Sequence, residues 1–159
     1  MQLTQLLFAA IFAATIPVPD RPADHQFRAT AYQPHQTVAN CGRSNKPWID
    51  STGGGPNGAW TGKRLEPWHC AVSLGRPKAL PYGTIIKVGS PINREMLVVD
   101  CGPGVRSNQL DFCFIYEKDY DKFIHDQGEL KRRWVNVWVT GKIGRKAART
   151  WRPTSERGE

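Results

Sequence analysis

Short stretches in which apolar and polar residues alternate recur along this chain, and glycine, proline or asparagine separates most of them. Alternation with a period of two is typical of a β-strand that buries one face. The pattern predicts strands over residues 27–32, 69–74, 84–88, 95–100, 109–115 and 134–140. Leu-Pro-Tyr-Gly at residues 80–83 and Gly-Pro-Gly at residues 102–104 predict turns, because these residue types favour the turn conformations.

Helical spacing of apolar residues is confined to residues 119–128, where Tyr120, Phe123 and Ile124 predict one short helix. Residues 33–58 are rich in Gly, Pro, Asn and Ser and predict a long surface loop. About six short strands suit a small closed barrel, which removes exposed strand edges. The predicted class is mainly β, with a six-stranded barrel and one or two short helices.

The length of 159 residues supports one domain. Residues 6–16 form an apolar run of the length of a signal-peptide core, too short to span a membrane, and Pro17 and Pro19 end it. No lysine or arginine precedes the run, so a buried first helix is the alternative. We expect a signal peptide and linker over 1–26, a barrel domain over 27–140 and a basic tail over 141–159. The protein would then be secreted, either extracellular or, in a bacterium, periplasmic.

The cysteines are Cys41, Cys70, Cys101 and Cys113. An even number in an exported chain suggests two disulfides, with three possible pairings, of which we favour Cys101–Cys113 with Cys41–Cys70. A zinc site is the less favoured alternative, because no C-x-x-C pair is present.

The formal net charge is +8, and the residues after Thr140 are the most basic stretch. A basic exported protein is attracted to anionic polymers such as acidic polysaccharides. For the stretch after Thr140 taken alone, we favour a solvated, soluble tail over a specific binding site. No nucleic-acid motif accompanies the charge, so we expect no nucleic-acid partner.

Two aspartates stand out because they lie on apolar strands. Asp100 ends the strand before the Gly-Pro-Gly turn, and Asp111 lies between Leu110 and Phe112. Carboxylates there are costly unless they are paired or hydrogen-bonded. If the turn brings them together, one can hold its proton near neutral pH and protonate a glycosidic oxygen. The alternative is that both accept backbone N–H bonds at turns.

A series of short motifs follows one order along the chain. They are Thr30-Ala31-Tyr32, Thr61-Gly62, Ala71-Val72-Ser73, Leu80-Pro81-Tyr82-Gly83-Thr84, an ungapped block over residues 99–111, and Val135-Asn136-Val137-Trp138-Val139. In order and spacing they resemble the three-aspartate (3D) domain. That domain is a double-psi β-barrel found in membrane-bound lytic transglycosylase A and in bacterial wall-lytic proteins. The resemblance covers residues 30–139.

The resemblance implies that Asp111 is the catalytic acid, that Asp100 supports it, and that Arg106 holds an anionic glycan. In that family an aspartate protonates the leaving oxygen and then takes the proton of the C6 hydroxyl of N-acetylmuramic acid. This closes a 1,6-anhydro ring without water, metal or cofactor. The matched motifs also imply substrate-binding positions at Tyr32, Thr61, Gly62, Ser73, Gly102 and Asn108.

The chain departs from the family pattern at several positions. Ser73 stands in place of the first aspartate, Cys101 replaces a threonine, and Pro103 and Ser107 replace glycines. The run Asp-Cys-Gly-Pro also resembles rare-lipoprotein-A-like barrels. The related expansin and barwin-type barrels bind polysaccharide, often without hydrolysing it. A monomer that cleaves peptidoglycan and a non-catalytic polysaccharide-binding module or secreted effector therefore both remain. An inhibitor that binds through the 33–58 loop is a third reading.

Other residues give weaker signals. Trp48, Trp60, Trp68 and Tyr82 lie in or beside predicted loops, where aromatic rings can stack on sugars or anchor the packing. His69 begins a strand and is a second acid–base candidate or, more simply, a structural histidine. No His–Asp arrangement accompanies Ser73, which argues against a serine hydrolase.

Overall fold

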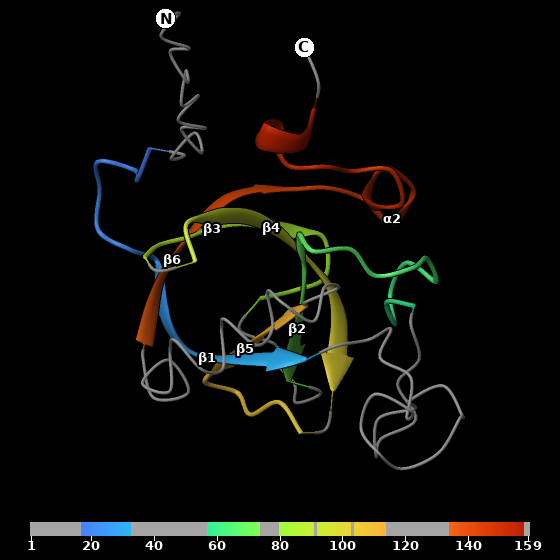
Figure 1. Ribbon diagram of the computed structural model, residues 1–159, viewed down its shortest axis with the longest axis horizontal. Coiled ribbons are helices and arrows are strands. Elements are labelled where there is room, and N and C mark those ends of the chain that lie inside the picture. The colour runs from blue at the N-terminus through green and yellow to red at the C-terminus, as the bar shows by residue number, and fades with distance from the viewer. Residues whose placement is uncertain are drawn as a thin grey trace, which may run out of the picture.

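A computed structural model describes residues 17–32, 57–73, 80–90, 92–102, 104–113 and 134–157, and these ranges form a six-stranded barrel followed by two short helical turns (Figure 1). The strands are β1 (His25–Tyr32), β2 (His69–Ser73), β3 (Thr84–Val88), β4 (Arg94–Gly102), β5 (Gln109–Cys113) and β6 (Trp134–Lys142). The helical turns are α2 (Arg145–Ala148) and the 3-10 turn η2 (Thr154–Glu156).

The predicted class, mainly β with a closed barrel, is confirmed, and each predicted strand has its counterpart. The bounds of β3 match the prediction. Strand β1 begins earlier, at His25, because the chain already pairs with β6 there, where His25 lies opposite Val137. Strand β4 continues to Gly102 beside β2, and β6 continues to Lys142 beside β3.

The strands follow each other around the barrel in the order β1-β5-β2-β4-β3-β6. The pairs β1–β5 and β2–β4 are parallel, and the other pairs are antiparallel. Advancing every strand by three positions in the sequence maps β1–β5 onto β2–β4 and β1–β6 onto β3–β4, and it maps β2–β5 and β3–β6 each onto itself, with every direction preserved. The connectivity is therefore the same in both halves of the chain, β1 to β3 and β4 to β6.

The barrel interior holds one apolar cluster. Its members alternate along each strand, so that Phe27 and Ala29 of β1 and Leu110 and Phe112 of β5 are all buried. Every strand supplies at least one such pair of residues, as a period of two requires for a single buried face. The apolar positions of the alternating sequence pattern are therefore the residues that fill the barrel interior.

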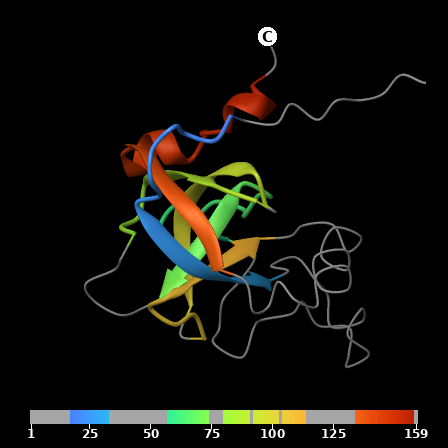
Figure 2. The ribbon, with the colours of Figure 1, turned by 90° about the vertical axis from the view of Figure 1, so that its left-hand side faces the viewer.

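Strand β4 is buried on both faces. Met96 and Val98 belong to the interior cluster, whereas Leu97 and Val99 belong to a second cluster outside the barrel. The covering residues come from the loop around Leu65 and from the segment after β6. Figure 2 shows that segment lying across one side of the barrel. The continuous apolar run of β4 is therefore explained by two packing partners.

The residues after β6 pack closely, although they are strongly basic. Ala148 of α2 is buried in the outer cluster, and Trp151 packs against it. Glu95 accepts hydrogen bonds from the Thr154 backbone N–H at 2.9 Å and from its hydroxyl at 3.3 Å. These contacts hold residues 145–156 against β4.

The predicted disulfide between Cys101 and Cys113 is wrong for this structure, in which Cys70, Cys101 and Cys113 all carry free thiols. The reason is the strand order, because β2 lies between β4 and β5. Two strand spacings separate the backbones by about 9.5 Å, beyond the usual Cα separation of a disulfide. The partner proposed for Cys70, Cys41, lies outside the described residues.

Further predictions fall outside the described ranges: the apolar run 6–16, the loop 33–58 apart from Asn57 and Gly58, Pro103, and the helix 119–128. In the part of the chain that is described, none of the helices is long and apolar enough to cross a membrane.

Candidate active site

A register shift in the β2–β4 pair sets the direction of Asp100. Cys70 lies opposite Val98, but the next residue, Ala71, lies opposite Asp100, so that Val99 has no partner on β2. Such a bulge turns the following side chain onto the other face. Without it, Asp100 would share the inward face of Val98. With it, Asp100 lies beside Ala71 on the outer face of the barrel.

Asp111 reaches the same face from the other side of β2. It lies opposite Ala71 in the β2–β5 pair and opposite Thr30 in the β1–β5 pair. Ala71 therefore separates the two aspartates, whose Cα atoms are about 9.5 Å apart by strand spacing. Ala71 contributes only a methyl group between the two aspartates, both of which are half-buried residues. We call Asp100, Ala71 and Asp111 the carboxylate row.

Donors from two different parts of the described chain hold the Asp100 carboxylate. The Ala59 backbone N–H donates to one oxygen at 2.9 Å, and the Tyr32 hydroxyl donates to the other at 3.2 Å. Nearby, the Trp60 N–H donates to the Val99 carbonyl at 3.0 Å. Asp100 thus ties β1 and the loop around Ala59 to β4, which fixes the orientation of its own oxygens.

The electrostatics show that the carboxylate row and the end of β1 form one environment. Burial raises the pKa of Tyr32 well above its usual value, and the Cys113 thiol and both aspartates raise it further. Burial, then the charge of Asp100, likewise raises the pKa of Cys113. At neutral pH, the Tyr32 hydroxyl therefore keeps the proton that it donates to Asp100, and Cys113 stays a thiol.

An aromatic pair lies beside Asp100. Trp60 and Tyr82 are stacked, with ring centroids 5.9 Å apart and planes inclined by 19°. Burial and a hydrogen bond with Cys101 raise the pKa of Tyr82, to which the charge of Asp100 contributes. The pair is therefore anchored to the strand that carries Asp100. Flat aromatic surfaces of this kind can stack on a sugar ring.

Four of the residues implied by the resemblance gather at one end of the barrel. Ser73 lies opposite Gly102 where β2 and β4 end, and Arg106 and Asn108 are exposed in the turn before β5. The Gln109 side chain accepts the Arg106 backbone N–H at 2.8 Å, which closes this turn. Ser73 follows Ala71 by two positions and so lies on the same face as the carboxylate row.

Thr61 and Gly62 form a tight turn. Thr61 is 1% exposed, and its hydroxyl accepts the Lys63 backbone N–H at 3.3 Å. Gly62 has φ of 64°, which favours glycine, and its N–H donates to Gly58 at 2.9 Å. In this geometry both residues shape the loop that carries Ala59 and Trp60 towards Asp100.

His69 precedes Ala71 by two positions on the same face of β2 and is buried. Its Nδ1 accepts the Glu66 backbone N–H at 3.0 Å. Burial lowers the pKa of His69 to about 4, so the ring is neutral at neutral pH and carries its proton on Nε2. Within the described ranges, no group of three or more His, Cys, Asp or Glu residues could hold a metal ion.

Sequence reasoning missed a second group of polar residues beside the carboxylate row. Lys63 and Arg64 meet Arg149 and Arg152 around a cleft of about 330 Å³. The contact joins segments more than 80 residues apart, as the hydrogen bond from Arg149 Nε to the Thr61 carbonyl at 3.1 Å shows. The basic composition after Thr140 was the one available signal, and it did not indicate what these residues contact.

Comparison of the chain with known proteins gives no match, either to a protein-family model or to a curated protein sequence.

Proposed function

We propose that this protein is a secreted, cell-wall-active barrel that cleaves the glycosidic bond between N-acetylmuramic acid and N-acetylglucosamine in peptidoglycan, in the manner of a lytic transglycosylase. The observation that carries the proposal is the carboxylate row. Two carboxylates on the outer face of the barrel, separated by the smallest chiral side chain, provide the pair of acidic groups that most glycosidases use to cleave a glycosidic bond. The 3D-domain resemblance adds the specific reaction.

The hydrogen bonds of Asp100 support the role that the resemblance implies for it. Both oxygens of Asp100 accept hydrogen bonds, from Ala59 and Tyr32, which suits a fixed negative charge beside a developing oxocarbenium ion. Asp111, in the middle of β5, is then the acid and base. It donates its proton to the glycosidic oxygen as the bond to C1 breaks, and the departing sugar leaves with a free hydroxyl.

Ring closure restores the proton. The C6 hydroxyl oxygen attacks C1 while Asp111 takes the hydroxyl proton, so the products are a 1,6-anhydro sugar and a saccharide with a free hydroxyl, with no water consumed. Asp111 ends the cycle protonated, as it began. The stacked pair of Trp60 and Tyr82, next to Asp100, is the surface on which a neighbouring sugar would stack.

The test is digestion of purified peptidoglycan followed by mass spectrometry. We expect anhydro-muropeptides from the wild type, a loss of at least about 100-fold in Asp111→Asn, since general acid catalysis contributes about that much or more, and a smaller loss in Asp100→Asn. Asp20→Asn, which removes an exposed carboxylate from the segment before β1, is the matched control. Equal yields from wild type and Asp111→Asn would exclude the mechanism.

A second candidate function is polysaccharide binding without cleavage. The observation that favours it is Ser73, which occupies the outer face next to Ala71, where the family pattern has a third carboxylate. Under this alternative, the protein sediments with insoluble cell-wall glycan and releases neither anhydro nor reducing ends. Sedimentation that is unchanged when both Trp60 and Tyr82 are replaced by alanine would count against it.

A further inference from the structure

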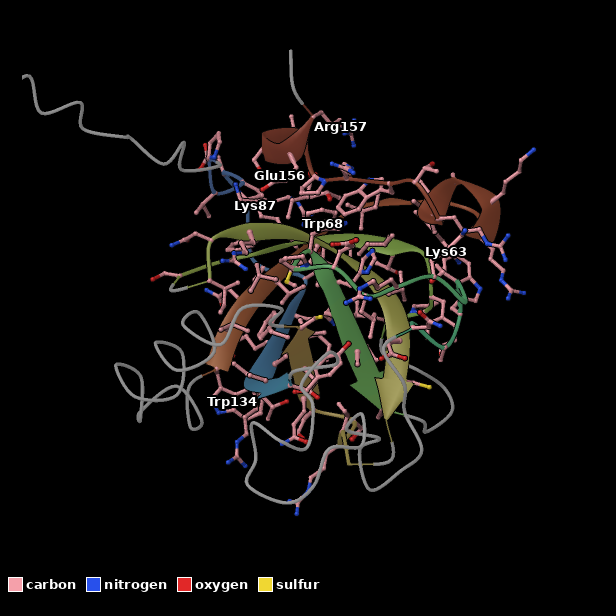
Figure 3. The ribbon with its side chains drawn as sticks, turned by 45° about the vertical axis from the view of Figure 1, so that its right-hand side comes forward. Lys63, Trp68, Lys87, Trp134, Glu156 and Arg157 are labelled. Atoms are coloured by element: carbon pink, nitrogen blue, oxygen red, sulfur yellow. The ribbon has the colours of Figure 1, made fainter. Side chains whose placement is uncertain are left out.

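A concave basic surface lies beside β2, between the loop before that strand and the segment after β6. This cleft of about 330 Å³, called here the basic cleft, is lined by the cations Lys63, Arg64, Arg149 and Arg152, with Glu66 as the acidic residue. Figure 3 shows Lys63 on the side of α2 and Trp68 at the start of β2, beneath the C-terminal segment. The balance of charge in the basic cleft is therefore strongly positive.

Three aromatic side chains of the basic cleft each carry a ring N–H without a hydrogen-bond partner. They are Trp68 Nε1, His69 Nε2 and Trp151 Nε1, for which no partner is present among the described residues. His69 is 5% exposed. Because its Nδ1 accepts the Glu66 N–H, its Nε2 must be the donor in the neutral ring. Buried donors without acceptors are uncommon and destabilising.

The same features complement a negatively charged oxygen. Ring N–H donors supply directed hydrogen bonds, and guanidinium and ammonium groups supply charge and further donors. The walls are also fixed, because Arg149 Nε is bonded to the Thr61 carbonyl and the Arg152 guanidinium carbon lies 5.6 Å from the Trp68 ring centroid. We propose that the basic cleft binds an oxyanion group, a carboxylate, sulfate or phosphate, carried by a saccharide.

The position of the cleft favours a saccharide over nucleic acid as the carrier. His69 and Ala71 are two positions apart on one face of β2, about 7 Å by strand rise, so the cleft adjoins the carboxylate row. A chain with a phosphate at every unit would bring successive charges against Glu66, Asp100 and Asp111. A glycan with separated anionic groups avoids this repulsion. The choice of a saccharide rests on the proposed function, whereas the oxyanion site itself does not.

Calorimetric titration of the intact protein with sodium sulfate, inorganic phosphate, a trigalacturonate, a neutral trisaccharide and a short DNA tests the assignment. We expect the trigalacturonate to bind, the neutral trisaccharide not to bind, and free sulfate to compete. Binding of DNA more tightly than the trigalacturonate would overturn the saccharide assignment. Absence of binding by sulfate, phosphate and the trigalacturonate alike would overturn the oxyanion site.

Variants locate the binding. Arg152→Gln and Trp151→Phe should each weaken the trigalacturonate about 10-fold, the effect of losing one good hydrogen bond or ion pair. Lys142→Gln, at the exposed end of β6, removes the same charge and should leave the affinity unchanged. His69→Asn, which keeps an acceptor near the Nδ1 position but lacks the Nε2 donor, should weaken binding, and His69→Gln should restore part of it. Equal losses of trigalacturonate affinity in Arg152→Gln and Lys142→Gln would show that binding depends only on the net charge of the protein, and would refute the site.

These experiments distinguish a failure of the proposed enzymatic function from a failure of the proposed oxyanion site. Sulfate or trigalacturonate binding that is sensitive to Arg152→Gln, with no anhydro product from peptidoglycan, would remove the enzymatic function and keep the oxyanion site. Anhydro products without any oxyanion binding would remove the oxyanion site and keep the enzymatic function.

Discussion

The buried neutral state of His69 predicts a pH-dependent loss of stability. Burial lowers the pKa of its imidazole from 6.5 to about 4 in the folded protein. In the unfolded chain the ring titrates at its ordinary value. Between these two pH values the unfolded state binds a proton that the folded state does not bind. The contribution of His69 to stability is therefore complete above pH 6.5 and falls as the pH drops towards 4.

The magnitude follows from the same shift. Each pKa unit is worth about 1.4 kcal/mol, so the drop from 6.5 to about 4 amounts to about 3 kcal/mol at the acid end. No discount for solvent screening is needed, because the side chain is only 5% exposed. A small domain has a total stability of about 5–15 kcal/mol, so a loss of this size is readily measured.

Urea unfolding at several pH values between 7 and 4, for the wild type and for His69→Asn, measures this contribution. Every other titrating group is common to both proteins, so the difference between the two stability curves isolates His69. We expect the advantage of the wild type over the variant to shrink by about 3 kcal/mol across this range. Parallel curves would show that His69 titrates normally in the folded protein and would refute its burial as a neutral donor.

Two further predictions concern the barrel itself. Gly83 has φ of 83°, and an added Cβ would lie 2.2 Å from a backbone oxygen of the segment after β6, so Gly83→Ala should cost at least about 2 kcal/mol in urea unfolding. Gly104→Ala, where an added Cβ meets nothing within 4 Å, should change stability by less than about 0.5 kcal/mol. Burial raises the pKa of the Cys70 and Cys113 thiols, so both should resist iodoacetamide at neutral pH until the protein is unfolded in guanidinium chloride. Mass mapping of rapid alkylation at either cysteine in the native protein would contradict their placement in the two apolar clusters.

The positions of the strands could be predicted because each carries its own alternating pattern. The interior residues of β1 and β5 are the apolar members of that alternation, such as Phe27 and Leu110. The order of the strands around the barrel could not be derived in the same way. It depends on pairs that are distant in sequence, such as Ala31 of β1 beside Phe112 of β5.

The disulfide prediction failed for the same reason. Cys101 and Cys113 are close in sequence and flank one turn, yet their strands are not neighbours. Strand β2, from much earlier in the chain, inserts between them. The inserted strand also creates the carboxylate row, because it places Ala71 between Asp100 and Asp111. The position of β2 therefore separates Cys101 from Cys113 and also brings the two aspartates to either side of Ala71.

The direction of Asp100 rests on the bulge at Val99, for which the sequence Leu-Val-Val-Asp offers no local signal. A strand without the bulge would bury this carboxylate in the barrel interior, at a cost of several kcal/mol for an ion without partners. The bulge places the carboxylate where the Ala59 N–H and the Tyr32 hydroxyl reach it. The register shift between β2 and β4 therefore keeps the charged Asp100 side chain out of the barrel interior and gives it hydrogen-bond partners. A replacement at Asp100 that lacks oxygens removes the acceptor that both donors share, so it acts on the loop around Ala59 as well as on any reaction at Asp111.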